Sequence, residues 1–450
     1  MSIINKKEAI VLFLGDIVVF FVSLFITLYV RYGGNISEKI FKSHLASFSI
    51  LFIVWVLIYF ISGLYDKHTT ILKNKLPAIL FNVGLVNTAM AVLFFYLIPY
   101  FDITPKTNLF VYLLFSFVLM LFWRLRGVEF FSTKRKHNAL VIGSGKEMQE
   151  LVSEVNGNSR YDLKFISSVD VENIEAIDFQ EEILNRIYAE EISVIAVDLR
   201  NEKVTKILPA LYNLIFSRVQ FIDMHKLYED IFDRVPLSLV KYSWFLENIS
   251  LTPKMAFDVP KRIMDIFLGG ALALLSLIIY PFVIIAIKIE DGREIFSVQT
   301  RVGRNNKEIK LFKFRSMAFT DGGKWDGDGK ENYVTKVGSF IRKTRIDELP
   351  QLWNVLMGDI SLIGPRPEFA EAVKKYTEDI PYYNIRHLIK PGLSGWAQMK
   401  HDKHPHHGTD TIETKNKLSY DLYYIKNRSF ILDLKIALQT IQIMLLVKGR

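Results

Sequence analysis

Residues 263–288 read IMDIFLGGALALLSLIIYPFVIIAIK, an apolar run long enough to cross a bilayer as a helix. Pro281 lies well inside this run, where it removes a backbone hydrogen bond and predicts a break or kink. Basic residues stand at both ends, with Lys261 and Arg262 before the run and Lys288 at its end. This pattern favours a re-entrant hairpin that enters and leaves the membrane on one face. Hydropathy alone also allows a straight crossing, and the chemistry of the downstream motifs has to decide between the two.

Four further apolar stretches occupy the first quarter of the chain, each with the roughly 20 residues that a membrane-crossing helix needs. The first is too long for a secretory signal, contains Asp16, and is followed by no small-x-small cleavage site. Because a carboxylate is costly in lipid, we expect Asp16 to face the interior of a helix bundle. We therefore predict a four-helix transmembrane domain over residues 1–130, with helices at 8–30, 46–64, 79–101 and 108–128.

Basic residues set the orientation of such a bundle. The third loop offers only Lys106, and the first loop (Arg31, Lys39, Lys42) is less decisive. Most of the positive charge follows the second and fourth helices, at Lys67, Lys73, Lys75, Arg124, Arg126, Lys134, Arg135 and Lys136. Both ends of the bundle are therefore expected on the cytoplasmic side.

The overall composition supports a membrane protein, since half of the residues are hydrophobic. The chain has no cysteine, which excludes disulfides, thiolate metal sites and a cysteine nucleophile. Its formal charge of +9 fits basic loops beside an anionic leaflet better than a nucleic-acid surface. We expect no nucleic-acid partner.

Residues 137–250 alternate short apolar strands with helical patterns, which predicts a Rossmann-like α/β accessory domain. The first strand runs into Gly143-Ser-Gly145, a turn typical of dinucleotide-binding folds. However, the third glycine of that fingerprint falls at Met148, and Asp170 is only a loose candidate for the ribose contact. An NAD-dependent epimerase or dehydratase stays a rival interpretation, weakened also by the absence of a Tyr-x-x-x-Lys pair. The expected strands are 138–142, 164–169, 192–198 and 219–223.

The segment Arg342-Lys-Thr-Arg345-Ile-Asp347-Glu348-Leu-Pro350 carries the densest charge. Two adjacent carboxylates cannot serve one point on a regular helix, so two roles are natural. One can attack or take a proton while the other holds a cation. The basic residues upstream, Arg342 and Arg345, suit phosphate oxygens. A charged amphipathic helix without chemistry is the alternative.

The neighbouring motifs favour phosphoryl chemistry over that alternative. Lys313-Phe-Arg315 places two cations on one face of an extended strand, spaced for a diphosphate. Gly364-Pro-Arg366-Pro367 is a rigid turn that presents an arginine, and a second Gly/Pro loop follows at 390–398.

The string TKVGSFIRKTRIDELPQLWNVLMGDISLIGPRP, residues 335–367, closely resembles the bacterial polyprenyl-phosphate glycosylphosphotransferases. Arg301-Val-Gly303, KFRSM, KPGLSGWAQ and Tyr420-Asp421-Leu-Tyr-Tyr424 also resemble that family's signatures. The match covers roughly 259–450, which we expect to form a monotopic α/β catalytic domain with its re-entrant helix at 263–288. The four-helix bundle with a Rossmann-like module resembles the family's long form, found in exopolysaccharide, capsule and O-antigen assembly.

The resemblance implies a mechanism residue by residue. Asp347 matches the aspartate that attacks the β-phosphate of a UDP-sugar, giving a phosphosugar-enzyme intermediate and releasing UMP. Glu348 matches its acidic neighbour, associated with Mg²⁺, so the two carboxylates are also the expected metal site. Lys313, Arg315 and Arg366 fall on positions expected to cradle phosphate.

The resemblance also implies the partners and the location of this enzyme. Undecaprenyl phosphate, the usual lipid acceptor of the family, would attack the intermediate at the cytoplasmic face of the bacterial inner membrane. Because a UDP-sugar is cytosolic, the hairpin keeps the active site with its substrate, whereas a straight crossing would not. A homodimer is possible by analogy with long-form relatives. A membrane scaffold with a degenerate catalytic domain is the non-enzyme rival, and the intact acidic pair argues against it.

Three features lie outside or depart from these motifs. The family's Ser-Pro break is Tyr280-Pro281 here, so a hydroxyl cap is missing. Four histidines crowd residues 401–407, which favours a solvated loop over a transition-metal site. Residues 429–446 are amphipathic, and Leu432, Ile436 and Ile441 suit a helix lying in the membrane interface.

Overall fold

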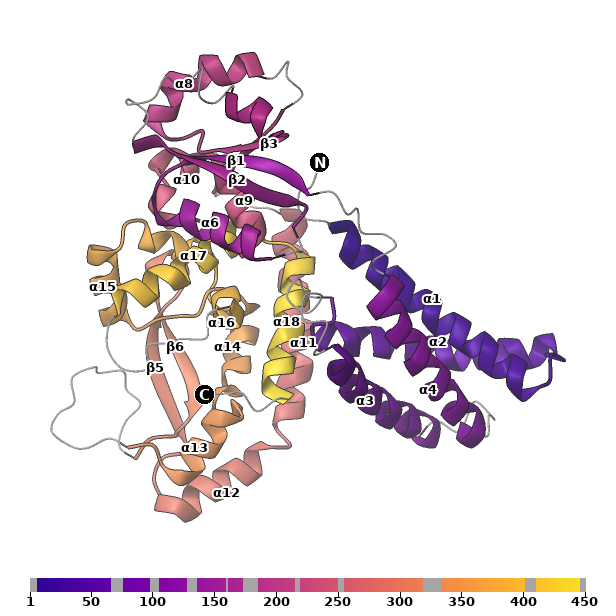
Figure 1. Cartoon of the computed structure of the whole chain (residues 1–450). Helices are drawn as coiled ribbons and strands as arrows, with labels where there is room; N and C mark the ends of the chain where they lie inside the picture. Colours follow the sequence, from indigo (N-terminus) through magenta and orange to yellow (C-terminus); the bar gives the residue numbers. More distant parts are fainter. Residues whose placement is uncertain are drawn as a thin grey trace. The chain divides into compact units, whose positions relative to one another are not determined.

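The computed structural model divides the chain into two compact units, Met1–Leu227 and Tyr228–Arg450, which are described separately (Figure 1). The first unit holds an α-helical bundle and an α/β module. The second holds the motifs gathered around the acidic pair. The described residues are 6–65, 76–97, 105–127, 136–158, 161–172, 185–214, 219–249, 255–318, 333–400 and 410–445.

Four apolar helices near the N-terminus are long enough to cross a membrane, as the sequence predicts. Their bounds are α1 Lys6–Arg31, α2 Glu38–Ile61, α3 Leu76–Leu97 and α4 Pro105–Phe122, and a π-turn, η2, follows at Trp123–Gly127. Helix α2 begins earlier than its apolar run, because the Ser37 hydroxyl accepts a hydrogen bond from the Ile40 amide and caps the helix. Aromatic side chains fill the bundle core, with the rings of Phe48 and Tyr112 4.9 Å apart.

Asp16 is fully buried in this bundle, as expected for a carboxylate in a membrane helix. Its partner is Arg124, whose Nε donates to Asp16 Oδ1 at 3.0 Å and whose Nη2 pairs with Oδ2. The Tyr65 hydroxyl donates to the same carboxylate at 2.8 Å, and Arg124 Nη1 donates to the Leu64 carbonyl. Arg124, one of the basic residues that follow the fourth helix, is thus buried in the bundle and not exposed in a loop. Burial of both charges is offset by their direct pairing inside the bundle.

The α/β module contains a parallel four-stranded sheet in the order β2-β1-β3-β4. All four predicted strands are confirmed, at β1 His137–Gly143, β2 Leu163–Asp170, β3 Val194–Val197 and β4 Gln220–Asp223. Gly145 has φ +84°, which lets the chain turn sharply from β1 into helix α6, Gly145–Gly157. The position of the missing third glycine holds Met148, whose side chain is buried. Helices α8 Glu202–Asn213 and α9 Met224–Phe232 complete the module, and α9 continues into the second unit.

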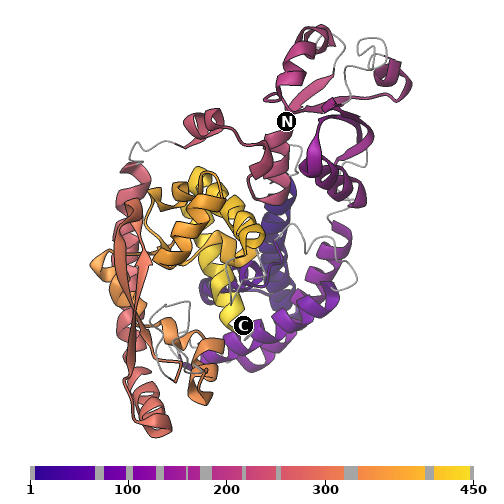
Figure 2. The ribbon, with the colours of Figure 1, turned by 90° about the vertical axis from the view of Figure 1, so that its left-hand side faces the viewer.

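The apolar run that opens the second unit forms two helices, α11 Met255–Ser276 and α12 Tyr280–Asp291, bent by 51°. Helix α12 leaves the line of α11 at the lower end of both views (Figures 1 and 2). The predicted break is therefore present, but it lies at 277–279, where three-residue turn hydrogen bonds replace the helical pattern. Pro281 stands in the first turn of α12, a position where its missing amide costs nothing.

Helix α14, Gln351–Met357, packs closely against α11, because Gly269 leaves room for the Val355 side chain. Arg262 on α11 donates to the carbonyls of Val355 and Leu356 at the C-terminal end of α14. The remaining elements are η5 Leu237–Leu239, α10 Tyr242–Asn248, β5 Phe296–Val302, η6 Arg304–Asn306, β6 Glu308–Phe314, α13 Lys336–Lys343, η7 Ile346–Glu348, α14 Gln351–Met357, β7 Ser361–Ile363, α15 Ala370–Asp379, η8 Tyr383–Leu388, β8 Gly392–Ser394, α16 Trp396–Lys400, α17 Thr411–Asn427 and α18 Phe430–Leu445.

Helix α18 has one protein face and one exposed apolar face. Ile436 is fully buried and Leu432 packs beside it, so these two side chains do not face a membrane as expected. Asp433 on the same inner face pairs with Lys261 of α11 at 2.5 Å. The outer face carries Ile431, Leu434 and Ile441, which remain exposed. Only the outer face suits an interface with lipid.

Candidate active site

The acidic pair lies in a tight turn between two helices. Helix α13 ends at Lys343, and Arg345 then adopts a left-handed conformation with φ +55° that reverses the chain. The 3-10 turn η7 follows, and its Asp347 and Glu348 are both more than nine-tenths buried. Both carboxylates approach the same cation, because Lys313 Nζ lies 3.3 Å from Glu348 Oε1 and 4.0 Å from Asp347 Oδ2.

Glu348 is the carboxylate that the surrounding cations neutralise. Arg366 Nη2 donates to its Oε1 at 2.8 Å, and Lys313 Nζ donates to the same oxygen at 3.3 Å. Arg345 Nη1 lies 3.5 Å from Oε2. Burial would raise the pKa of Glu348, but these three cations outweigh it and hold that pKa far below its ordinary value. Glu348 is therefore ionised at any physiological pH.

Asp347 has a different environment although it is the adjacent residue. Its nearest cation in the described structure is Lys313, whose Nζ lies 4.0 Å from Oδ2. Burial and the negative charge of Glu348 raise the pKa of Asp347 to about 6. Glu348 is thus held in ion pairs, whereas burial and Glu348 disfavour the negative charge of Asp347. A carboxylate with a pKa perturbed in this way is a candidate for a reactive group.

The raised pKa of Asp347 gives a pH prediction. The resemblance implies that the Asp347 carboxylate attacks in its ionised form, and on that expectation kcat/KM should fall about tenfold per pH unit below about pH 6 and level off above it. Lys313 stabilises the ionised form, so Lys313→Gln should move this acid limb to higher pH. Steady-state rates measured from pH 5 to 8 would check both points. An acid limb that does not move in the Lys313 variant would contradict the electrostatic account.

The turn that carries Arg366 is held by a second Gly/Pro loop. Strands β7 and β8 pair in parallel, with Ser361 opposite Gly392 and Ile363 opposite Ser394. A Cβ on Gly392 would lie 2.0 Å from the Gly364 nitrogen, so the two backbones meet only because glycine occupies these positions. The Gly364–Pro367 turn and the loop at 390–398, about 25 residues apart in the sequence, thus pack directly against each other and fix the backbone that carries Arg366.

A buried ion pair behind Arg366 was not found by sequence reasoning. Arg386 Nη2 donates to the Arg366 carbonyl at 2.9 Å and lies 2.8 Å from Asp421 Oδ2. Both side chains are at least 96% buried. Asp421 belongs to the Tyr420–Tyr424 motif, so the sequence marks Asp421 but does not indicate that Arg386 is its partner. Arg386 itself lies in η8, where no local pattern marks it.

The amino-acid sequence was compared with those of known proteins, and the matches cover the part of the chain that carries this site. The sequence model of the family described as "Bacterial sugar transferase" matches residues 256–447. An exopolysaccharide production protein, PSS, from Rhizobium leguminosarum bv. phaseoli is 36% identical over 41% of this chain and 94% of its own length. The chain belongs to the bacterial sugar transferase family.

Two further relatives carry more specific names. The UDP-N-acetylgalactosamine-undecaprenyl-phosphate N-acetylgalactosaminephosphotransferase of Aeromonas hydrophila is 42% identical over 44% of this chain. The UDP-glucose:undecaprenyl-phosphate glucose-1-phosphate transferase of Escherichia coli K12 is 39% identical over 40% of it. The chain matches 46% and 39% of the lengths of these two proteins. Their names specify different sugars, so the sugar does not follow from similarity.

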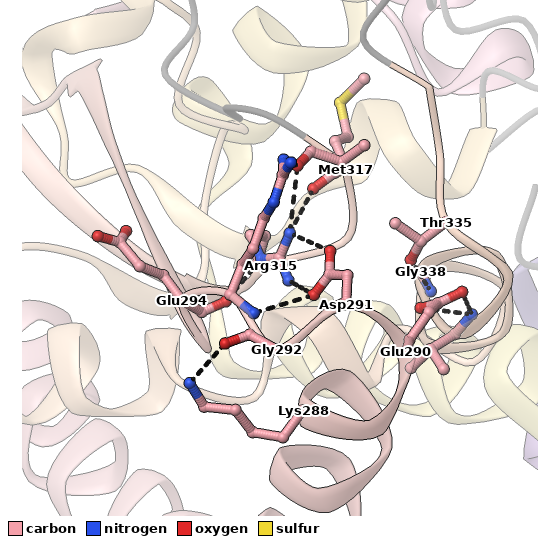
Figure 3. Close-up of polar contacts among 12 residues, drawn as sticks. Lys288, Glu290, Asp291, Gly292, Glu294, Arg315, Met317, Thr335 and Gly338 are labelled. Atoms are coloured by element: carbon pink, nitrogen blue, oxygen red, sulfur yellow. Dashed lines mark hydrogen bonds and ion pairs between the residues drawn. The ribbon is translucent and has the colours of Figure 1, made fainter.

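Two of the predicted phosphate ligands, Arg342 and Arg315, contact other residues of the chain. Arg342 Nε donates to the Ser316 hydroxyl at 2.8 Å, while its charge still lowers the pKa of Asp347. Arg315 forms a two-pronged ion pair with Asp291 at the end of α12, and its Nη1 donates to Oδ2 at 2.7 Å (Figure 3). The structure therefore gives Lys313 and Arg315 different acidic partners.

Within the described residues, no group of three or more His, Asp or Glu side chains is placed to hold a metal. Asp347 and Glu348 remain the expected metal site. Histidines 401–407 lie outside the described residues. Asp170, the loose candidate for a ribose contact, accepts a hydrogen bond from the Glu172 amide.

Proposed function

We propose that this protein transfers a sugar-1-phosphate from a UDP-sugar to undecaprenyl phosphate, releasing UMP, through a phosphosugar intermediate on Asp347. This reaction would be the first membrane step of exopolysaccharide, capsule or O-antigen assembly. The observation that carries the proposal is the unequal environment of the two adjacent carboxylates. Glu348 is neutralised by three cations, whereas Asp347 is buried with its pKa raised to about 6.

The first step forms a bond between an Asp347 carboxylate oxygen and the β-phosphorus of the UDP-sugar. The bond from that phosphorus to the bridging oxygen breaks, and UMP leaves with the electron pair. Lys313, Arg345 and Arg366 contact Glu348, the residue next to Asp347, so their positive charge lies near the phosphorus under attack and favours the transition state. In the second step an oxygen of the lipid phosphate attacks the same phosphorus, and the Asp347 carboxylate is released as the leaving group.

Mg²⁺ is the proposed cofactor, and the donor set fits it. Mg²⁺ usually keeps several waters and binds through one or two carboxylates together with substrate phosphates. Asp347 and Glu348 supply two adjacent carboxylates, and the ion would neutralise charge on the diphosphate when bound. The cations around Glu348 would then serve the phosphates that arrive with the metal.

The bent pair α11–α12 is proposed to be a re-entrant hairpin that keeps residues 290–450 on the cytoplasmic face of the inner membrane. Exposed apolar side chains on both helices, among them Phe267, Leu274, Phe282 and Ile289, support contact with lipid. The transferase domain would then span 259–450, after a membrane domain at 1–130 and an accessory domain at 137–250. A reporter fused to the C-terminus should read out as cytoplasmic, and a periplasmic signal would overturn the hairpin.

The deciding experiment uses the purified full chain, undecaprenyl phosphate and a panel of UDP-sugars, with UMP release as the readout. We expect UMP from at least one donor, dependent on both lipid and Mg²⁺. Excess EDTA should stop the reaction and added Mg²⁺ should restore it. UMP release that persists in EDTA would remove the metal from the mechanism, and no release from any donor would argue against the transferase.

A further inference from the structure

Two consecutive carboxylates at the end of α12 hold two different parts of the transferase domain (Figure 3). Asp291 pairs with both terminal nitrogens of Arg315, whose Nε also donates to the Glu294 carbonyl at 2.6 Å. The same guanidinium donates to the carbonyls of Met317 and Ala318, both at 3.3 Å. The segment after β6 is thereby tied to the C-terminal end of α12.

Glu290, the preceding residue, caps the N-terminus of α13. Its carboxylate accepts hydrogen bonds from the backbone amides of Lys336 at 2.7 Å and Val337 at 3.2 Å. The Thr335 hydroxyl completes the cap by accepting from the Gly338 amide at 2.9 Å. A carboxylate at this position also interacts favourably with the positive end of the helix dipole.

The elements held by Glu290 and Asp291 lead directly to the acidic pair. Helix α13 is eight residues long and ends two residues before Arg345, the left-handed residue that starts the turn bearing Asp347 and Glu348. Residues 345–348 are called the catalytic turn below. An apolar cluster joins α12 to the same region, with Ile287 of α12, Phe314 of β6 and Ile341 of α13 buried together. Ile346, which precedes Asp347, packs against this cluster. The end of α12 and the catalytic turn are therefore parts of one packed block.

We propose that Glu290 and Asp291 lock the apolar helix α12 to the catalytic turn, and that Arg315 is a positioning residue acting through Asp291. This inference rests on the proposed transferase function. It assigns Arg315 a role different from the phosphate contact that its motif implies. The reason is occupancy: Asp291 takes both terminal nitrogens and a carbonyl takes Nε, so a phosphate would have to displace a bidentate carboxylate.

The test compares four single variants in the full chain, assayed with whichever UDP-sugar of the panel supports turnover. Asp291→Asn and Arg315→Lys should each lower kcat about tenfold to hundredfold, because small displacements of catalytic groups cost that much. KM for the UDP-sugar should change less than about twofold, since no phosphate contact is lost. The double variant should be no slower than the slower single variant, because both remove one interaction.

Glu294→Gln is the matched control, because it removes a carboxylate three residues away while keeping the carbonyl that Arg315 uses. In Figure 3 the Glu294 carboxylate points away from Arg315. This variant should keep wild-type kcat and KM. A large rise in KM for Arg315→Lys combined with wild-type behaviour of Asp291→Asn would overturn the proposal and restore the phosphate role.

Glu290→Gln supplies an independent arm if the Asp291 or Arg315 variants fail to fold. It leaves the Asp291–Arg315 pair intact and weakens only the cap of α13. We expect a several-fold lower kcat at unchanged KM, together with faster amide hydrogen exchange across residues 336–348. Unchanged kcat and unchanged exchange would overturn the lock. The exchange measurement needs no substrate, so it still tests the lock if the wild-type protein releases UMP from no donor.

Discussion

Asp347→Asn is expected to lower sugar-phosphate transfer by about 10³-fold or more, because it replaces the proposed nucleophile by a neutral amide. The amide has nearly the same shape, so the 3-10 turn and its neighbours should keep their packing. Replacing the carboxylate also removes a charge that burial and Glu348 already disfavour, so stability should not fall. UMP release by the purified full chain measures the loss of activity.

Trapping the intermediate separates loss of the nucleophile from general damage. Wild-type protein given a labelled UDP-sugar without lipid acceptor should retain label covalently, and the Asp347 variant should not. Glu371→Gln, at an exposed position on α15, is a charge-matched control that should label and turn over normally. Wild-type-like turnover of Asp347→Asn would contradict the proposed intermediate on Asp347.

Asp16→Asn should destabilise the N-terminal bundle by about 3–5 kcal/mol, since it leaves the Arg124 guanidinium buried without its counter-charge. Unfolding of the detergent-solubilised protein, followed by the near-ultraviolet signal of the bundle aromatics, would measure the loss. The double variant Asp16→Asn/Arg124→Gln should recover part of it, because neither charge then remains. Glu38→Gln, which breaks an exposed pair with Lys42, should have no measurable effect. A double variant less stable than Asp16→Asn would contradict the pairing.

Features that depend on neighbouring residues could be predicted from the sequence. The four apolar helices and the parallel strands follow from the period and length of apolar runs, which local backbone geometry translates directly into elements. The break before α12 was expected from Pro281, although the proline begins the second helix instead of kinking one helix. The sequence also separated Asp347 and Glu348 from an ordinary charged helix through the motifs around them.

Pairings between distant residues could not be predicted in this way. Arg124 lies 108 residues from Asp16, and no pattern in the neighbouring sequence marks it as a buried arginine. Arg315 stands two residues after Lys313, and the sequence predicts the same phosphate-binding role for both. The chain leaves β6 between these residues, so one side chain turns to the acidic pair and the other to α12. Arg386 supports Arg366 only because η8 and α17 bring it to Asp421.

Local sequence patterns suffice to identify the acidic pair, the cations, the two Gly/Pro loops and the apolar helices beside them. The difference in pKa between the two carboxylates follows only from the folded chain. Asp347 and Glu348 are adjacent and chemically alike, so their local sequence predicts no difference between their pKa values. Burial raises the pKa of both groups, but the ion pairs with Arg366, Lys313 and Arg345 outweigh it at Glu348, whereas the negative charge of Glu348 adds to it at Asp347.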